Sequence, residues 1–460
     1  MTIAEGPAPE VRDPPAPAVD RPDLGLARSG GGPVWRTYLR ALGPGLVTGA
    51  SDDDPSGIAT YAQTGARYGL GMLWAALVTF PLMAGVQEIC DRTALATGKG
   101  LGELIVRRFS PPWRKAIGVL LGVLIIADAL NISADLVAVG AGMHLVHAGP
   151  TALWALVAGL VITVLLVSGS FVLIARVFKV LCAALLAYVG VLVMVKVSWG
   201  QVLLHTLVPH IQLTREYTAL IVAVLGTTIS PYLFFWQTLH RVEDMREEEA
   251  GGDRAQPLRR RSRRDARRKL STSRFDVVSG MAFSNVVMFA VIVATAATLG
   301  AHGHHPTIGS ADQAAAALRP VAGHWASTIF ALGFIGSGML AIPVLAGAGS
   351  AGMAGLLGKT SGYSESARNA PLFYGLVVLG TLGGTVLSLL GLDPIRLLVF
   401  VAIVNGVAAA PFLLIVMLVS NDHSIMGEHV NNRTARALGW SATALMAVAA
   451  IALFATGGGL

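Results

Sequence analysis

The stretch SDDDPSGIAT (51–60) places three consecutive carboxylates directly before a proline, inside sequence that is otherwise apolar from about Leu39. Proline removes a backbone donor and clashes with the preceding turn, so a helix through this stretch must open at Pro55. Carbonyls freed at the depth of a bilayer are tolerated only where they line a cavity or bind something. The stretch therefore predicts a broken helix with a binding site at the break.

The composition is that of a membrane protein. The 460 residues are 54% hydrophobic and 13% charged, against about 25% charged in a soluble domain, and the mean hydropathy is +0.64. Uncharged runs reach the roughly 20 residues that cross a bilayer as a helix. We expect an all-α polytopic membrane protein with about eleven transmembrane helices, near 39–65, 71–93, 116–145, 151–170, 177–198, 217–240, 276–300, 323–350, 371–391, 396–419 and 437–457.

The distribution of Lys and Arg predicts the orientation. They gather before the first expected span and after the second, sixth, eighth and tenth, which places the amino terminus in the cytoplasm and, with eleven crossings, the carboxyl terminus outside. The plasma (inner) membrane is the expected location. Residues 1–35 are rich in Pro, Asp and Gly and lack the apolar segment of a signal peptide, so we expect a disordered cytoplasmic tail before a transporter domain at 36–460.

One segment carries most of the net charge of +7. From Arg246 to Arg274 there are 11 Lys and Arg against 5 Asp and Glu. We interpret 242–274 as a basic cytoplasmic loop that follows the positive-inside rule, not as a nucleic-acid site. Contact with anionic lipid headgroups is the alternative.

A second break is expected in the sixth span, where Thr227-Thr228-Ile229-Ser230 precedes Pro231. Broken helices at matching places in two halves indicate a transporter's binding site. The two broken spans are five spans apart, an odd number, so the halves would be inverted repeats at about 39–198 and 217–419, with an extra helix at about 437–457. A kink without a site is the alternative, but an acid accompanies the first break.

Five motifs resemble those of the Nramp family of divalent-metal transporters, in order and at the family's spacing: GPGLVTGASDDDPSGIATYAQTGARYGLGMLW (43–74), ALATGKGL (94–101), SADLVAVG (133–140), GTTISPYLFFWQ (226–237) and NDHSIMGEHVNNR (421–433). The resemblance covers most of the chain. It implies eleven spans and the inverted-repeat fold shared with amino-acid and sodium-coupled transporters.

The departures from the family pattern concern the metal ligands. Asp54 of the family's Asp-Pro-Gly-Asn motif remains, whereas Gly57 replaces its Asn. Ser230 and Tyr232 stand where the family has Met and His, and Ala138 stands where the third span has Glu. This pattern resembles the Nramp-related magnesium transporters, a divergent branch.

The remaining donors are all oxygen, which suits Mg²⁺, Ca²⁺ and Mn²⁺, whereas a Met sulfur favours softer ions. Mg²⁺ is usually held by one or two carboxylates and keeps several waters. The expected metal site comprises the Asp54 carboxylate, directly or through water, the Ser51 and Thr227 carbonyls, the Ser230 hydroxyl and space beside Gly57. Thr228 and Asn405 are expected around these ligands.

Other acids allow two interpretations each. Asp52 and Asp53 either face an aqueous vestibule and concentrate cations, which we favour, or Asp53 is a ligand itself. Asp128, Asn131 and Asp135 share one face of the third span, and intramembrane acids are functional candidates. Without the family's Glu and His, we favour a wet wall of the ion pathway over a proton path.

The remaining motifs are given structural interpretations. Glu88 is expected to have an unidentified structural partner, HGHH (302–305) to lie solvated on an outer loop, and Cys90 and Cys182 to be buried small side chains. No catalytic or nucleotide-binding motif is present, so we expect neither an enzyme nor a cofactor.

We therefore expect a secondary transporter of divalent cations, Mg²⁺ first and Mn²⁺ second, that works by alternating access with weak or no coupling to protons. A cation-coupled symporter of a small organic solute is the alternative. An acid at the first break counts against a carboxylate substrate.

Overall fold

The computed structural model describes residues 44–168, 189, 190, 192, 197–248, 255–299, 313, 325–391 and 394–457. Within these ranges every regular element is a helix, which confirms the all-α class. The predicted tail (1–35), most of the predicted fifth span, HGHH (302–305) and Cys182 lie outside them. The helices are α2 (Pro44–Asp52), α3 (Pro55–Tyr68), α4 (Trp74–Thr97), α5 (Leu101–Arg108), α6 (Pro111–Leu145), α7 (Thr151–Ser168), α10 (Trp199–Leu207), α11 (Arg215–Thr228), α12 (Pro231–Arg246), α13 (Arg263–Thr298), α15 (Ala326–Leu356), α16 (Pro371–Ser388), α17 (Pro394–Ser420), α18 (His423–Met426) and α19 (Arg433–Ala455), with single 3₁₀ turns η1 (Leu258–Arg260) and η4 (Gly427–His429).

Both predicted breaks are present. The first span divides into α2 and α3 around Asp53 and Asp54, and the sixth divides into α11 and α12 around Ile229 and Ser230. Each second half begins with proline at its first position, where the missing N–H costs no helical hydrogen bond. The same two prolines that end one helix therefore begin the next.

Eight described helical segments are long and apolar enough to cross a membrane, with α11 and α12 counted as one segment. They coincide with eight of the eleven predicted spans. The first predicted span forms α2 and α3, which are short because of the break, and the second forms α4. The count of eleven stays a prediction, since the fifth span is mostly undescribed.

Glycines set the closest helix contacts near the breaks. A Cβ atom on Gly49 of α2 would overlap the backbone of Gly280 in α13, and one on Gly226 of α11 would overlap the backbone of Gly406 in α17. Small residues let membrane helices approach until their backbones touch. The two half-helices that lead into the breaks are thus each packed against one continuous helix.

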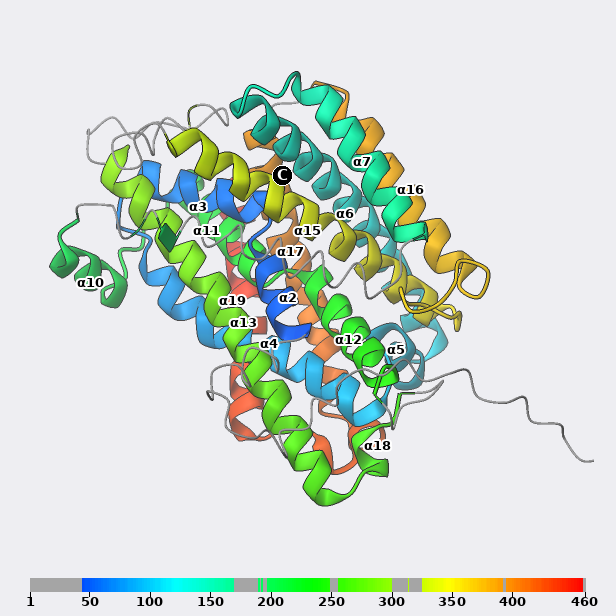
Figure 1. Ribbon diagram of the computed structural model, residues 1–460. Helices are drawn as coiled ribbons and strands as arrows, with labels where there is room; N and C mark the ends of the chain where they lie inside the picture. The colour runs from blue at the N-terminus through cyan, green and yellow to red at the C-terminus, as the bar shows by residue number, and fades with distance from the viewer. Residues whose placement is uncertain are drawn as a thin grey trace, which may run out of the picture. The chain divides into compact units, whose positions relative to one another are not determined.

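A second group of helices packs beside the breaks. α6 contacts α7, α15 and α16, and α7 also contacts α16; Figure 1 shows α6, α7 and α16 running side by side. Pro55 lies against this group, because a Cβ on Gly338 of α15 would be 3.4 Å from the Pro55 ring and 3.2 Å from the Asp135 carbonyl of α6. The first break therefore faces α6 and α15.

The basic segment differs from the predicted loop. Residues 258–260 form η1 and α13 begins at Arg263, so much of 242–274 is helical. Leu258 is buried in a small apolar cluster with Leu95, Met245 and Ala266. The segment is attached to the helical body and is largely helical, and its cytoplasmic location stays a prediction.

Candidate metal site at the two helix breaks

Asp54 caps α3 and is almost completely buried, with 2% of its surface exposed. One carboxylate oxygen accepts from the Gly57 amide at 2.7 Å and from the Ser56 hydroxyl at 2.5 Å. The other accepts from the Asn131 amide of α6 at 3.1 Å. These donors hold the carboxylate at the break by neutral groups alone, so its negative charge stays available to a cation.

The Ser51 and Thr227 carbonyls lack their usual amide donors, because the residues four positions on are Pro55 and Pro231. Each carbonyl lies within reach of a hydroxyl instead. The Tyr232 hydroxyl of α12 donates to the Ser51 carbonyl at 3.3 Å, and the Ser230 hydroxyl lies 3.2 Å from the Thr227 carbonyl, with the Gly226 carbonyl as its nearer acceptor. The Tyr232 contact joins the two breaks.

The hydroxyls of the second break donate to the end of α11. Ser230 contacts the Gly226 carbonyl at 2.7 Å, and Thr228 contacts the Val224 carbonyl at 3.0 Å. A hydroxyl that donates still has lone pairs for a cation, so Ser230 retains the capacity expected of it. Thr228 and Asn405 are buried, but no described hydrogen bond brings either to Asp54.

Tyr61 was missed by the sequence analysis. Its hydroxyl accepts from the Thr227 hydroxyl at 3.4 Å, so α3 also reaches the second break. It follows Asp54 by seven residues, about two helical turns, and this spacing was the available signal. A Cβ on Gly57 would lie 3.4 Å from the Tyr61 ring, which is an ordinary contact, and 3.3 Å from the Asp52 carbonyl. The space beside Gly57 is thus bounded by the Tyr61 ring and the Asp52 carbonyl.

Asp52 and Asp53 do not face a vestibule in this conformation. Both are fully buried, and both contact the Ser284 hydroxyl of α13, at 2.9 and 3.2 Å. Ser284 was not predicted. The second oxygen of each acid has no hydrogen-bond partner within the described part of the chain. The favoured vestibule interpretation is wrong for this conformation, because α13 covers both side chains.

The three polar residues of α6 have different environments. Asn131 reaches Asp54, as described above. Asp128 and Asp135 are 3% and 0% exposed, and none of their carboxylate oxygens has a hydrogen-bond partner among the described residues. They remain buried acids without a described hydrogen-bond partner, on the helix that supplies Asn131 to the first break.

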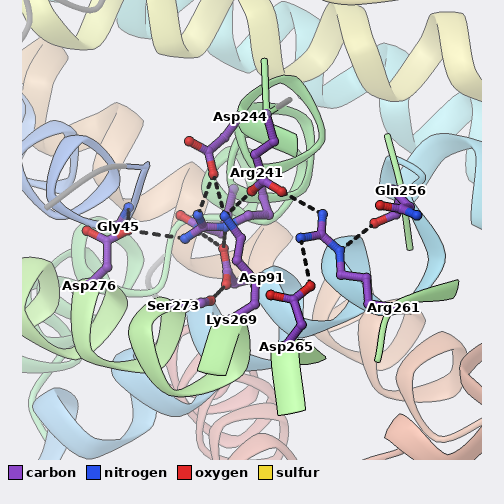
Figure 2. A network of polar contacts seen from close by, with 12 residues as sticks. Gly45, Asp91, Arg241, Asp244, Gln256, Arg261, Asp265, Lys269, Ser273 and Asp276 are labelled. Carbon is purple, nitrogen blue, oxygen red and sulfur yellow. Dashed lines mark hydrogen bonds and ion pairs between the residues drawn. The ribbon is translucent and has the colours of Figure 1, made fainter. Parts of the chain in front are cut away.

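The start of α2 is held by a separate polar network (Figure 2). Asp276 of α13 accepts from the backbone amides of Gly45 at 2.8 Å and Leu46 at 3.3 Å, and so caps α2 from another helix. Arg241 of α12 pairs with Asp276 at 3.1 Å and with Asp91 of α4 at 2.5 Å. The network connects α2 with α4, α12 and α13.

The structure gives the environments of Glu88 and Cys90, for which the sequence suggested structural roles. Glu88 pairs with Arg92 at 3.2 Å and with Arg274 at 3.3 Å, which supplies the partner the sequence left unidentified. Cys90 is a buried free thiol. In the described residues no three His, Cys, Asp or Glu side chains are grouped to hold a metal, so a cation at the breaks would depend on backbone carbonyls, hydroxyls and water besides Asp54.

The sequence is similar to a family of known proteins. The model of the natural resistance-associated macrophage protein-like (Nramp) family matches residues 45–456. A divalent metal cation transporter MntH of Verminephrobacter eiseniae is 29% identical over 65% of each chain, just under two thirds of that relative's length. Another MntH, from Klebsiella pneumoniae, is 26% identical over 89% of this chain and 92% of its own.

Solved structures are similar in fold. The Eremococcus coleocola manganese transporter, in complex with an aromatic bis-isothiourea compound, superimposes with a TM-score of 0.71 at 16% identity, over 94% of this chain and 91% of its own. Mhp1, a nucleobase-cation-symport-1 family transporter, superimposes with a TM-score of 0.53 at 12% identity, over 90% and 93%. At these identities the similarity concerns the fold alone.

Proposed function

We propose, from the premise that this chain belongs to the natural resistance-associated macrophage protein-like (Nramp) family, that it is a secondary transporter of divalent metal cations that prefers Mg²⁺ and works by alternating access. The observation that carries the proposal is the geometry of the breaks. The Asp54 carboxylate is buried where α2 gives way to α3, and the Ser51 and Thr227 carbonyls at the two breaks have lost their amide donors to prolines. Two such half-helices ending at a midplane site are typical of alternating-access carriers.

The preference for Mg²⁺ rests on the donor set. Carboxylate, carbonyl, hydroxyl and water oxygens suit Mg²⁺ and Mn²⁺, whereas the thioether that would favour softer ions is replaced by Ser230. A single carboxylate with several waters is the usual arrangement for Mg²⁺ in proteins. The relatives described as manganese or divalent-metal transporters make Mn²⁺ the natural second ion.

We further propose that transport is weakly coupled or uncoupled to protons. Tyr232 and Ala138 occupy positions where the family motifs have titratable His and Glu, although Asp135 remains. The membrane potential suffices for uptake, since it contributes about 2.3 kcal/mol per charge per 100 mV. For a divalent ion this is about 4.6 kcal/mol, or roughly 2,000-fold accumulation at 100 mV.

The test is ion flux into liposomes that contain the full chain. Uptake of Mg²⁺, Mn²⁺ and Ca²⁺ is measured at a clamped potential, with a pH-sensitive dye inside. We expect Mg²⁺ uptake that depends on potential and leaves the internal pH unchanged. Failure of all three ions to enter would refute the transport function, and Mn²⁺ uptake without Mg²⁺ uptake would refute the preference alone. Metal-dependent acidification that disappears in Asp135→Asn would show proton coupling.

The proposed orientation has the amino terminus in the cytoplasm and the carboxyl terminus outside, in the plasma membrane. It rests on the Lys and Arg asymmetry and on the count of eleven spans. A single cysteine added at the carboxyl terminus should react with an impermeant thiol reagent in intact cells, whereas one added at the amino terminus should not.

A further inference from the structure

The eight cations between Arg259 and Lys269 form two groups. Arg261 pairs with Glu248 at 2.6 Å, and Lys269 pairs with Glu248 and, at 3.3 Å, with Asp244. The others are exposed, and no ion pair joins them to any described acid: Arg259, Arg260, Arg263, Arg264, Arg267 and Arg268. Two of these side chains thus attach the segment to the protein, and the other six are exposed at its surface.

Four of the six lie on one side of α13. Residues of an α-helix turn by about 100° each, so Arg263, Arg264, Arg267 and Arg268 fall within an arc of roughly 140°. The buried residues Ala266 and Ser273 of the same helix lie about 130° and 150° from the centre of that arc. The four arginines therefore face away from the helical body.

The same face of α13 continues toward the membrane with apolar side chains. Phe275, Val278 and Val286 are within the arc by helical spacing, and they are 43%, 38% and 45% exposed. Exposed apolar residues on a membrane-spanning helix are suited to lipid tails. The face that carries the arginines thus continues into exposed apolar side chains of a kind suited to lipid tails.

The spacing along α13 between the arginines and the exposed apolar side chains matches the thickness of a bilayer's headgroup region. From Arg268 to Phe275 is seven residues, or about 10 Å along the helix. The headgroup layer of each leaflet is roughly 5–8 Å thick, and charges act over a further 8 Å or so in physiological salt. When Phe275 contacts the tails, Arg267 and Arg268 reach the headgroups, and Arg263 and Arg264 lie just beyond.

We propose that these four arginines bind the phosphates of anionic phospholipids in the adjoining leaflet. The guanidinium fork matches phosphate oxygens better than an ammonium does, and anionic leaflets attract basic segments next to a membrane span. The burial of Leu258 and the Arg261–Glu248 pair keep the surface in place. This inference does not depend on the transported ion.

The test measures lipid binding by the full chain in detergent, titrated with phosphatidylglycerol or phosphatidylcholine and followed by native mass spectrometry. The variant R263Q/R264Q/R267Q/R268Q is compared with R107Q/K115Q/R433Q/R436Q, which removes four exposed positive charges elsewhere. We expect wild type and the control to prefer phosphatidylglycerol, and the α13 variant to bind it at least about tenfold more weakly. The preference should also fall as salt rises.

Three outcomes would overturn the proposal. The α13 variant could keep the wild-type preference, or the control variant could lose as much, which would indicate an effect of net charge alone. Displacement of the lipid by millimolar inorganic phosphate would indicate a soluble-anion site. Ion flux in liposomes checks that both variants are folded, and its failure in wild type would concern the proposed transport and not this surface.

Discussion

The acids at the helix breaks and the acids at the start of α2 are equally hidden from solvent, but their surroundings differ in charge. Asp91 and Asp276 are 1% and 2% exposed and share the guanidinium of Arg241. Asp52, Asp53 and Asp135 are all 0% exposed, and no described Lys or Arg pairs with them. The buried acids at the start of α2 are neutralised by an arginine of the protein, whereas the buried acids at the breaks are paired with no described Lys or Arg.

We propose that this difference separates acids with a structural role from acids that take part in transport. A buried charge is costly unless it is paired, so the Arg241 network can be explained by the attachment of α2 to its neighbours. The acids at the breaks have only hydroxyl and amide donors, or no partner. Their retention in an apolar region is explained if a mobile cation supplies the missing charge during transport.

The largest expected effect is on transport by Asp54→Ala. This change removes the carboxylate that caps α3 at the first break, and we expect divalent-cation flux to fall by at least about 100-fold, the upper range for loss of a supporting metal contact. Protein yield should be unchanged. The matched control is Glu216→Ala, which removes an acid that is 64% exposed. Full flux by Asp54→Ala in liposomes would contradict the site assignment.

The next effect concerns stability. Arg241→Met leaves Asp91 and Asp276 buried without their cation, and we expect the free energy of unfolding to fall by about 3–5 kcal/mol. Arg246→Met is the control, because its partner Glu365 lies at 3.2 Å in a pair about a quarter exposed and should cost about 1 kcal/mol or less. Denaturant titration in detergent compares the two. Equal losses of unfolding free energy in the two variants would show that burial of the Arg241 network does not increase its contribution to stability.

The smallest expected effect is on stability when the charge of an unpaired buried acid is removed. Asp128→Asn keeps the shape but removes a charge that has no described partner, so we expect stability to stay the same or rise by about 1 kcal/mol. The same substitution at Asp91 removes a partner of Arg241 and should cost about 3 kcal/mol. Thermal unfolding of both variants is the measurement. A large loss in Asp128→Asn would mean that this acid is structural.

The breaks could be predicted because their cause is local. Pro55 and Pro231 remove amide donors in any tertiary context, so the ends of α2 and α11 follow from the sequence. Asp54 could be identified for the same reason, as the residue directly before a helix that begins with proline. The carbonyls of Ser51 and Thr227 then follow by counting four residues back.

The partners could not be predicted, because they come from distant parts of the chain. Ser284 lies more than 200 residues from Asp52, and Arg241 lies 150 from Asp91. No local pattern distinguishes Asp52, which α13 covers, from an acid that faces water. The attachment of the basic segment is likewise not predictable, because a run of arginines gives no local sign that Leu258 packs against Leu95.

The shortness of the first break has a mechanical consequence. Only Asp53 and Asp54 separate α2 from α3, and Pro55 has a fixed φ, so few backbone torsions can serve as the pivot. α2 has 9 residues and is about 13 Å long. A rotation of about 20° at the pivot would carry the Gly45 end through roughly 5 Å. That is more than enough to break its 2.8 Å hydrogen bond to Asp276. An ion bound at Asp54 would lie at this pivot. A small change in the position of its ligands would then be accompanied by a much larger displacement of the Gly45 end of α2.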